Sequence, residues 1–160
     1  MWRDKLFWTP LYLFTAAVLL LNFGRKGFLA LLFIVATVGI SDTVASKIIK
    51  PLVQRERPCR HAVEKNDKQI VVCGSGYSFP SAHATNHFAM AFMLSFIFRR
   101  RQKRWSYLLF AWAASIALAQ VYVGVHYPLD IFCGAILGCF LAFLMSRLYL
   151  KAEARGMTFP

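Results

Sequence analysis

Three short polar clusters interrupt an otherwise apolar chain, and their side chains are of the kinds that bind and transfer phosphate. Together they hold fixed positive charge, a serine at the start of an apolar run, and two histidines with one carboxylate. In chain order they are Lys50-x6-Arg57-Pro58, Pro80-Ser81-Ala82-His83 and His126-x3-Asp130. Apolar segments separate the clusters, so membrane-crossing helices must bring them to one surface.

The first cluster can clamp a phosphate group. Arg57 offers a planar fork that matches two phosphate oxygens, and Lys50 adds a point charge. The alternative is that both residues only anchor the chain at a membrane interface. Asp42 and Ser46 precede this lysine on the same helical face. We expect the Asp42 carboxylate to pair with Lys50 or Lys47, as either a structural or a functional pair.

The second cluster can present backbone amides to a phosphate. Ser81 is a good N-cap for the apolar run that follows, and capping alone is the alternative interpretation. A helix N-terminus also offers free N–H groups and a positive dipole end to an anion. The amides of Ala82 and His83 and the Ser81 hydroxyl can therefore contact phosphate oxygens, with the His83 ring as a donor. We interpret His87, one turn later, as a packing or hydrogen-bonded residue.

The third cluster can supply a nucleophile. Asp130 follows His126 by four residues and can reach one nitrogen of its ring. Such a carboxylate fixes the tautomer and stabilises the imidazolium, which leaves the other nitrogen free to attack. Pro128 suits the first turn of the following helix. The alternative is a histidine that is hydrogen-bonded at a helix start, with the carboxylate serving the helix dipole.

The rest of the chain is apolar enough to be embedded in a membrane. Of its 160 residues 58% are hydrophobic, and the mean hydropathy is +0.50. Backbone amides in lipid must be satisfied within the segment, which favours helices. We therefore predict one all-α domain, 1–160, with its motif core at 50–130 and a short extracytoplasmic loop region between helices two and three. About five transmembrane helices are expected, at 6–22, 28–49, 81–98, 105–121 and 129–150.

Charge in the loops orients this bundle. The net charge is +12, and it is concentrated in short loops between apolar runs, so it indicates topology and anion binding. We expect no nucleic-acid partner, because no motif for one is present. The run from Arg99 to Arg104 contains no acidic residue and lies on the same side as Arg25 and Lys26. The positive-inside rule makes that side cytoplasmic, and all three clusters then fall on the opposite side.

Two cysteines give a separate indication of which side of the membrane the long loop faces. Cys59 and Cys73 both lie in the long loop on the extracytoplasmic side. They can form a disulfide that stabilises the fold by about 3 kcal/mol, or they can remain free thiols. Within the last apolar run, Gly134 and Gly138 permit close helix packing, which we place within the bundle rather than between copies.

Taken together, the clusters resemble the signature of the type 2 phosphatidic acid phosphatase superfamily. That signature reads Lys-x6-Arg-Pro, then Pro-Ser-Gly-His, then Ser-Arg-x5-His-x3-Asp, and the match runs from Lys50 to Asp130 in the same order. Two departures stand out. The family glycine is Ala82, which keeps the backbone amide. The family Ser-Arg pair falls on Ala119 and Gln120, which removes one fixed positive charge from the expected site.

The resemblance implies a two-step mechanism without a metal or other cofactor. His126, oriented by Asp130, attacks phosphorus and becomes phosphohistidine, while His83 protonates the leaving oxygen and then serves as base for water. The residues implied to hold the phosphate are Lys50, Arg57, Ser81, Ala82 and Gln120. Arg55 and Arg60 are candidates to restore the missing charge. The sequence contains no Asp-rich or His/Cys cluster suited to a catalytic metal.

The resemblance also implies a lipid phosphate or pyrophosphate as substrate, bound at the bilayer surface. Lipid A 1-phosphate is favoured, and the other candidates are undecaprenyl pyrophosphate, phosphatidylglycerol phosphate and phosphatidic acid. We expect a multi-pass protein of a bacterial inner membrane, with its site facing the periplasm and its C-terminus in the cytoplasm. The alternatives are a lipid phosphotransferase and a catalytically weak protein that binds or transports lipid phosphates. The charge missing at Gln120 suggests the binding protein, and intramembrane Asp42 and Lys47 suggest the transporter.

Overall fold

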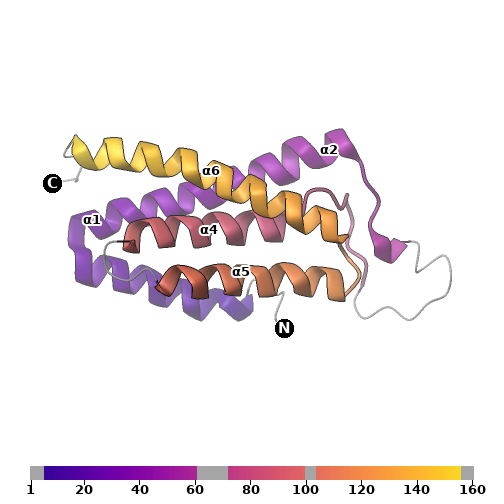
Figure 1. Cartoon of the computed structure of the whole chain (residues 1–160), viewed down its shortest axis with the longest axis horizontal. Coiled ribbons are helices and arrows are strands. Elements are labelled where there is room, and N and C mark those ends of the chain that lie inside the picture. The colour runs from indigo at the N-terminus through magenta and orange to yellow at the C-terminus, as the bar shows by residue number, and fades with distance from the viewer. Residues whose placement is uncertain (1–5, 61–71, 100–103, 156–160) are drawn as a thin grey trace.

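The computed structural model is a bundle of helices (Figure 1), and it describes residues 6–60, 72–99 and 104–155. The described residues contain helices and no strands, which confirms the predicted all-α fold class. The elements in chain order are η1 (Leu6–Trp8), α1 (Thr9–Thr43), η2 (Val44–Ile49), α2 (Lys50–Val53), α4 (Ala82–Phe98), α5 (Arg104–Tyr122) and α6 (Pro128–Ala154).

Helix α1 folds back on itself at Gly24. The backbone at this residue has φ 52° and ψ −126°, a conformation that is open to glycine because it has no Cβ. The two arms of α1 run in opposite directions from this turn (Figure 1). The predicted separation of the first two apolar runs is therefore a tight turn at one residue, and the second arm continues without a break through η2 into α2.

Three helices within the described residues are long and apolar enough to cross a membrane. They are Thr9–Val53, which includes both arms of α1, Arg104–Tyr122 and Pro128–Ala154. Helix α4 has 17 residues and packs against α1, α5 and α6 in the middle of the bundle (Figure 1). Large apolar side chains on the outer faces, such as Leu21 and Phe132, are exposed as lipid contact requires. The exact number of crossings stays a prediction.

Glycines bring α6 into close contact with α4. A Cβ at Gly134 would lie 2.8 Å from the carbonyl oxygen of Ser81, and a Cβ at Gly138 would overlap the carbonyl group of Thr85. These two glycines therefore pack within the bundle, as predicted. Their contact sets the start of α6 beside the start of α4, so the third cluster lies next to the second.

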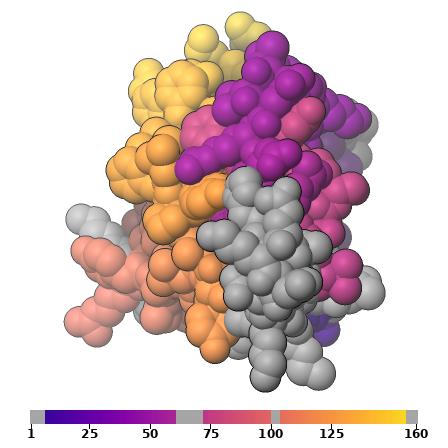
Figure 2. Space-filling model, turned by 90° about the vertical axis from the view of Figure 1, so that its right-hand side faces the viewer, coloured from indigo at the N-terminus to yellow at the C-terminus, as the bar shows by residue number. Residues whose placement is uncertain are grey.

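All three clusters lie at one end of the bundle. This end contains α2, the start of α4, the end of α5 and the start of α6 (Figure 1). Figure 2 looks onto it, and there the purple surface of the α1–α2 segment borders the orange surface of α6. A disulfide between Cys59 and Cys73, with Cα atoms 5.7 Å apart, joins the loop segments at this end. Which side of the membrane it faces stays a prediction.

Candidate active site

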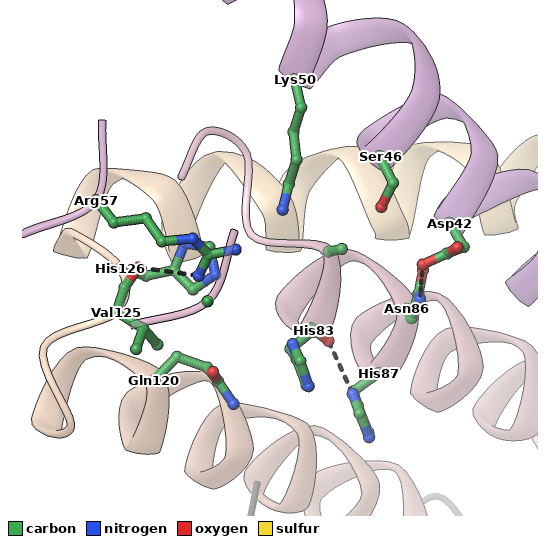
Figure 3. A pocket seen from close by; sticks show the side chains of 12 residues that line it. Asp42, Ser46, Lys50, Arg57, His83, Asn86, His87, Gln120, Val125 and His126 are labelled. Carbon is green, nitrogen blue, oxygen red and sulfur yellow. Dashed lines mark hydrogen bonds between the residues drawn. The ribbon is translucent and has the colours of Figure 1, made fainter. Parts of the chain in front are cut away.

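The three clusters surround one cavity of about 320 Å³, a size at the lower end of small-molecule sites. Figure 3 shows that side chains from the α1–α2 segment, α4, α5 and the loops before α4 and α6 face this space. The lining residues are Asp42, Ser46, Lys50, Arg57, Gly74, Ala82, His83, Asn86, His87, Gln120, Val125 and His126. Predicted site residues from all three clusters thus meet here, although they are far apart in the sequence.

His126 lies in the link between α5 and α6 and is 3% exposed. Its Nδ1 faces Oδ2 of Asp130 at 3.5 Å, and this nitrogen makes no hydrogen bond within the described residues. The distance is too long for a good hydrogen bond, but catalytic contacts of this kind often tighten only when substrate is bound. Because Nδ1 faces the carboxylate, Nε2 is the ring nitrogen available to the cavity.

Asp130 is fully buried and held in place on all sides. Its Oδ2 accepts a hydrogen bond from the Tyr127 N–H at 2.9 Å, which caps α6. Its Oδ1 accepts one from the Arg55 guanidinium, also at 2.9 Å. Its backbone carbonyl accepts the Ser81 N–H at 3.0 Å, which ties the third cluster to the second. These contacts hold the carboxylate in position beside the His126 ring.

The pKa of His126 is shifted below its ordinary value. Burial is the main cause, since it disfavours the charged ring, and the positive charges of Arg57 and Lys50 act in the same direction. The Asp130 carboxylate beside the ring favours the charged form and opposes the shift. The imidazole is therefore neutral at pH 7, and a neutral ring has the lone pair that a nucleophile needs.

Two positive side chains approach the cavity from different walls. The Arg57 Nε donates to the Gly76 carbonyl at 3.2 Å, and its Nη1 donates to the Val125 carbonyl at 3.4 Å. These bonds hold the guanidinium beside His126 (Figure 3). Lys50 points into the cavity from the end of the α1–α2 segment. Among the described residues, these are the arginine and lysine side chains that line the cavity.

The start of α4 forms another wall. The Ser81 hydroxyl accepts the Ala84 N–H at 3.4 Å and so caps the helix. Ala82 and His83 line the cavity, whereas Ser81 is completely buried behind them and is not part of the lining. The helix dipole therefore points its positive end at the cavity through the residues that follow the cap. A contact between the Ser81 hydroxyl and phosphate stays a prediction.

Gln120 lines the cavity in place of the arginine that the family signature has at this position. It is 1% exposed, and within the described residues its Nε2 makes no hydrogen bond. Buried donors without a partner are rare in folded proteins. The amide is thus a neutral donor at the cavity wall that a phosphate oxygen can satisfy.

Neither arginine that we considered as a replacement for the missing charge lines the cavity. Arg55 is bound to Asp130, and its guanidinium lies 4.0 Å from the centre of the Tyr127 ring. Arg60 Nη1 lies 3.7 Å from Oε1 of Glu56, four residues earlier in the chain. Arg55 instead holds the carboxylate that lies beside His126, a contact that was not predicted from the sequence.

Asn86 was not predicted as a site residue either, and its contact corrects the expected partner of Asp42. The Asp42 carboxylate accepts a hydrogen bond from Asn86 Nδ2 at 2.8 Å, so its partner is an amide on α4 rather than a lysine on its own segment. A useful signal was present, because Asn86 follows His83 by nearly one helical turn and so shares its face.

His87 is hydrogen-bonded at both nitrogens, as we predicted. Its Nδ1 lies 2.8 Å from the His83 carbonyl, and its Nε2 lies 3.0 Å from the Tyr12 hydroxyl. The carbonyl can only accept, so Nδ1 is the protonated nitrogen and Nε2 accepts from the tyrosine. The ring also lines the cavity.

Comparisons with known proteins identify the family of the chain. A family model described as the PAP2 superfamily matches residues 27–154. A lipid A 4′-phosphatase from Bacteroides thetaiotaomicron is 36% identical over 158 residues, covering 94% of this chain and 68% of that protein. One from Porphyromonas gingivalis is 30% identical over 147 residues, covering 88% and 61%. The chain thus spans about two thirds of the length of these curated relatives.

A solved structure extends the likeness to the fold. The crystal structure of a transmembrane PAP2-type phosphatidylglycerolphosphate phosphatase from Bacillus subtilis is similar, with a TM-score of 0.66 and 25% identity. The match covers 93% of this chain and 72% of that one. The chain belongs to the PAP2 superfamily and is a membrane-spanning hydrolase of lipid phosphoesters.

Proposed function

We propose that the protein removes a phosphate group from a lipid A-type glycolipid at the membrane surface, through a phosphohistidine intermediate. One observation carries this proposal. A buried histidine, whose lowered pKa favours the neutral ring, has a fixed carboxylate beside it and shares a cavity with a lysine, an arginine and a helix N-terminus. This arrangement supplies a nucleophile and a binding site for the phosphate that it attacks.

In the first step, His126 Nε2 attacks phosphorus in line with the bond to the leaving oxygen. The N–P bond forms as the P–O bond breaks, and the ring becomes an imidazolium that Asp130 stabilises. Lys50, Arg57 and the Gln120 amide hold the equatorial oxygens, where negative charge spreads in the transition state. The amides of Ala82 and His83, at the start of α4, act on the same oxygens.

His83 works as an acid in the first step and as a base in the second step. Its ring gives a proton to the leaving alkoxide, which departs as an alcohol. The same ring then takes a proton from water as the water attacks the phosphohistidine. Inorganic phosphate leaves, and His126 returns to its neutral form. This route requires no metal ion.

A second cavity supports a lipid substrate. It has a volume of about 290 Å³, is lined mainly by apolar residues, and lies among α1, α4 and α5. Tyr12 lines this apolar cavity, and its hydroxyl forms a hydrogen bond with the His87 ring. His87 in turn lines the cavity that the three clusters surround, called the phosphate cavity below. An acyl chain in the apolar cavity would therefore lie next to the reacting headgroup.

The relatives guide the choice of lipid. Two curated relatives are lipid A 4′-phosphatases, so the 4′-phosphate of a lipid A-type disaccharide is the first substrate to test. The 1-phosphate, which the sequence analysis favoured, comes second. Phosphatidylglycerol phosphate is third, because the similar solved structure is of an enzyme named for it.

We further propose that the site faces the periplasm of a bacterial inner membrane. The Cys59–Cys73 disulfide at the site end supports this side, since disulfides persist in oxidising compartments. The turn of α1 at Gly24 and the end of α4 lie at the other end of the bundle (Figure 1), and Arg25 and Arg99 follow them directly in the sequence; the positive-inside rule makes that end cytoplasmic. A single cysteine placed at Gly74 should react with a membrane-impermeant maleimide from outside spheroplasts, and labelling only after lysis would reverse the orientation.

The central test is phosphate release in detergent. We would assay the wild type and His126→Ala against the three lipids, with EDTA present. Release that continues in EDTA and disappears in the variant supports the proposal, as does trapping of acid-labile ³²P on the wild type. No release from any of the lipids would refute it. Label that moves to an added lipid acceptor instead of to water would assign a phosphotransferase.

A further inference from the structure

The phosphate cavity extends beyond the groups that the phosphatase mechanism uses. Asp42, Ser46 and Asn86 line the same cavity but have no role in the two steps above. In Figure 3 they lie on the side away from His126, with Lys50 and His83 between.

The geometry of in-line attack determines which part of the substrate faces these three side chains. The nucleophile and the leaving oxygen lie on opposite sides of phosphorus. With His126 on one side of the phosphate, the leaving alcohol must extend towards the opposite side of the cavity. That is where Asp42, Ser46 and Asn86 lie (Figure 3). His83, the proposed acid, is on the path between, where a leaving oxygen needs its proton.

The end of the cavity away from His126 presents mainly hydrogen-bond acceptors. Asn86 donates through Nδ2 to Asp42 Oδ1 at 2.8 Å, and this bond fixes the orientation of the amide. Its Oδ1 is therefore an acceptor, and this atom is buried without a hydrogen bond within the described residues. The Asp42 carboxylate has further acceptor capacity. Ser46, in the π-helical segment η2, directs its hydroxyl towards the same space (Figure 3).

Such a set of groups is costly in a membrane protein unless a ligand uses it. A carboxylate within an apolar helix is unfavourable, and ionisable groups in such positions commonly mark a substrate site. A plain hydrocarbon leaving group would leave these acceptors unpaired. The hydroxyl groups of a sugar or another polyol would satisfy them.

We propose that Asp42, Ser46 and Asn86 form a leaving-group subsite that binds hydroxyl groups of a sugar or polyol headgroup. The subsite selects lipid phosphates whose leaving alcohol carries further hydroxyls over those whose leaving alcohol is a plain alkyl or isoprenyl chain. This inference rests on the proposed phosphatase function and names the part of the protein that recognises the substrate class.

The test compares two phosphomonoesters with the same alkyl tail. Dodecyl glucoside phosphorylated on its sugar has hydroxyls on the leaving alcohol, and dodecyl phosphate has none. The quantity measured is the ratio of kcat/KM for the sugar substrate to kcat/KM for the alkyl substrate. We expect Asn86→Leu to lower this ratio by about ten- to hundredfold, the effect of one or two buried hydrogen bonds.

Two further variants make the test decisive. Ser46→Ala is a milder change that keeps the Asp42–Asn86 bond, and it should lower the same ratio by a smaller factor. Asn22→Leu is the matched control. The Asn22 side chain donates a hydrogen bond to the Val18 carbonyl at the opposite end of the bundle, so its replacement should leave the ratio unchanged. The detergent-solubilised full chain is used throughout, and its thermal unfolding reports whether each variant is folded.

The outcomes separate the two proposals. A wild type that releases phosphate from these esters, with the same ratio in the Asn86 and Ser46 variants, would overturn the subsite and leave the phosphatase function standing. A wild type that releases phosphate from neither ester would overturn both. A ratio that falls in both subsite variants but not in Asn22→Leu supports the subsite.

Discussion

Replacing Gln120 by leucine should stabilise the unliganded protein and weaken catalysis at the same time. The side chain is 1% exposed, and its Nε2 makes no hydrogen bond within the described residues. An unpaired buried donor costs about 1–3 kcal/mol. Leucine is similar in size and has no donor, so Gln120→Leu should raise the free energy of unfolding by part of that amount.

The same substitution should be unfavourable when substrate is bound. If the Gln120 amide donates to a phosphate oxygen, the hydrogen bond to a charged group contributes about 1.5–3 kcal/mol. Its loss should then lower kcat/KM by about ten- to hundredfold, since each 1.4 kcal/mol is about a factor of ten. A residue with only a structural role would not move activity and stability in opposite directions.

The assay combines phosphate release with thermal unfolding in the same detergent, the latter without substrate. Gln120→Glu is the matched control, because it keeps the size of the side chain but sets a negative charge against the phosphate. It should lower kcat/KM by more than Gln120→Leu does. Wild-type kcat/KM in Gln120→Leu, together with an unchanged or lower unfolding temperature, would refute the reasoning.

Three further predictions concern the groups around the nucleophile. Because burial lowers the pKa of His126, the ring should be mainly neutral at pH 6.5 and gain its proton only at lower pH. An NMR titration, with His126→Ala to assign the signal, measures this pKa. A titration midpoint at or above pH 6.5 would contradict the prediction. Arg55→Gln should lower kcat about tenfold with little change in KM, since Arg55 acts through Asp130 rather than on substrate; a change in KM alone would contradict that role. Replacing Cys59 and Cys73 by serine should lower the free energy of unfolding by about 3 kcal/mol, and unaltered denaturation in detergent would count against it.

Much of the fold was predictable because it depends on local pattern. Apolar runs of the right length predicted helices, and the positions of the polar clusters at the ends of those runs predicted that they meet at one end of the bundle. The break between the first two runs was located to within a few residues. Its form, a turn at Gly24, depends on a positive φ that apolar patterning does not report.

The candidate site was predictable where a residue acts through its own local backbone. The distance from His126 to Asp130 is one helical turn, and Ser81 caps the helix that it precedes, so spacing alone indicated both relations. Gln120 was identified as an anomaly from its position in the motif, although only burial shows that its amide lacks a partner.

Contacts between helices could not be predicted in this way. Spacing along one helix suggested a lysine partner for Asp42, whereas the packing of α1 on α4 pairs it with Asn86. Arg55 and Arg57 are two residues apart, yet Arg55 binds Asp130, which lies beside His126, and Arg57 lines the cavity. The sequence by itself thus determined the helices, the clusters and their common end. The tertiary structure decided which charged side chains line the cavity and which polar groups lie at the end away from His126, because these depend on side-chain directions across packed helices.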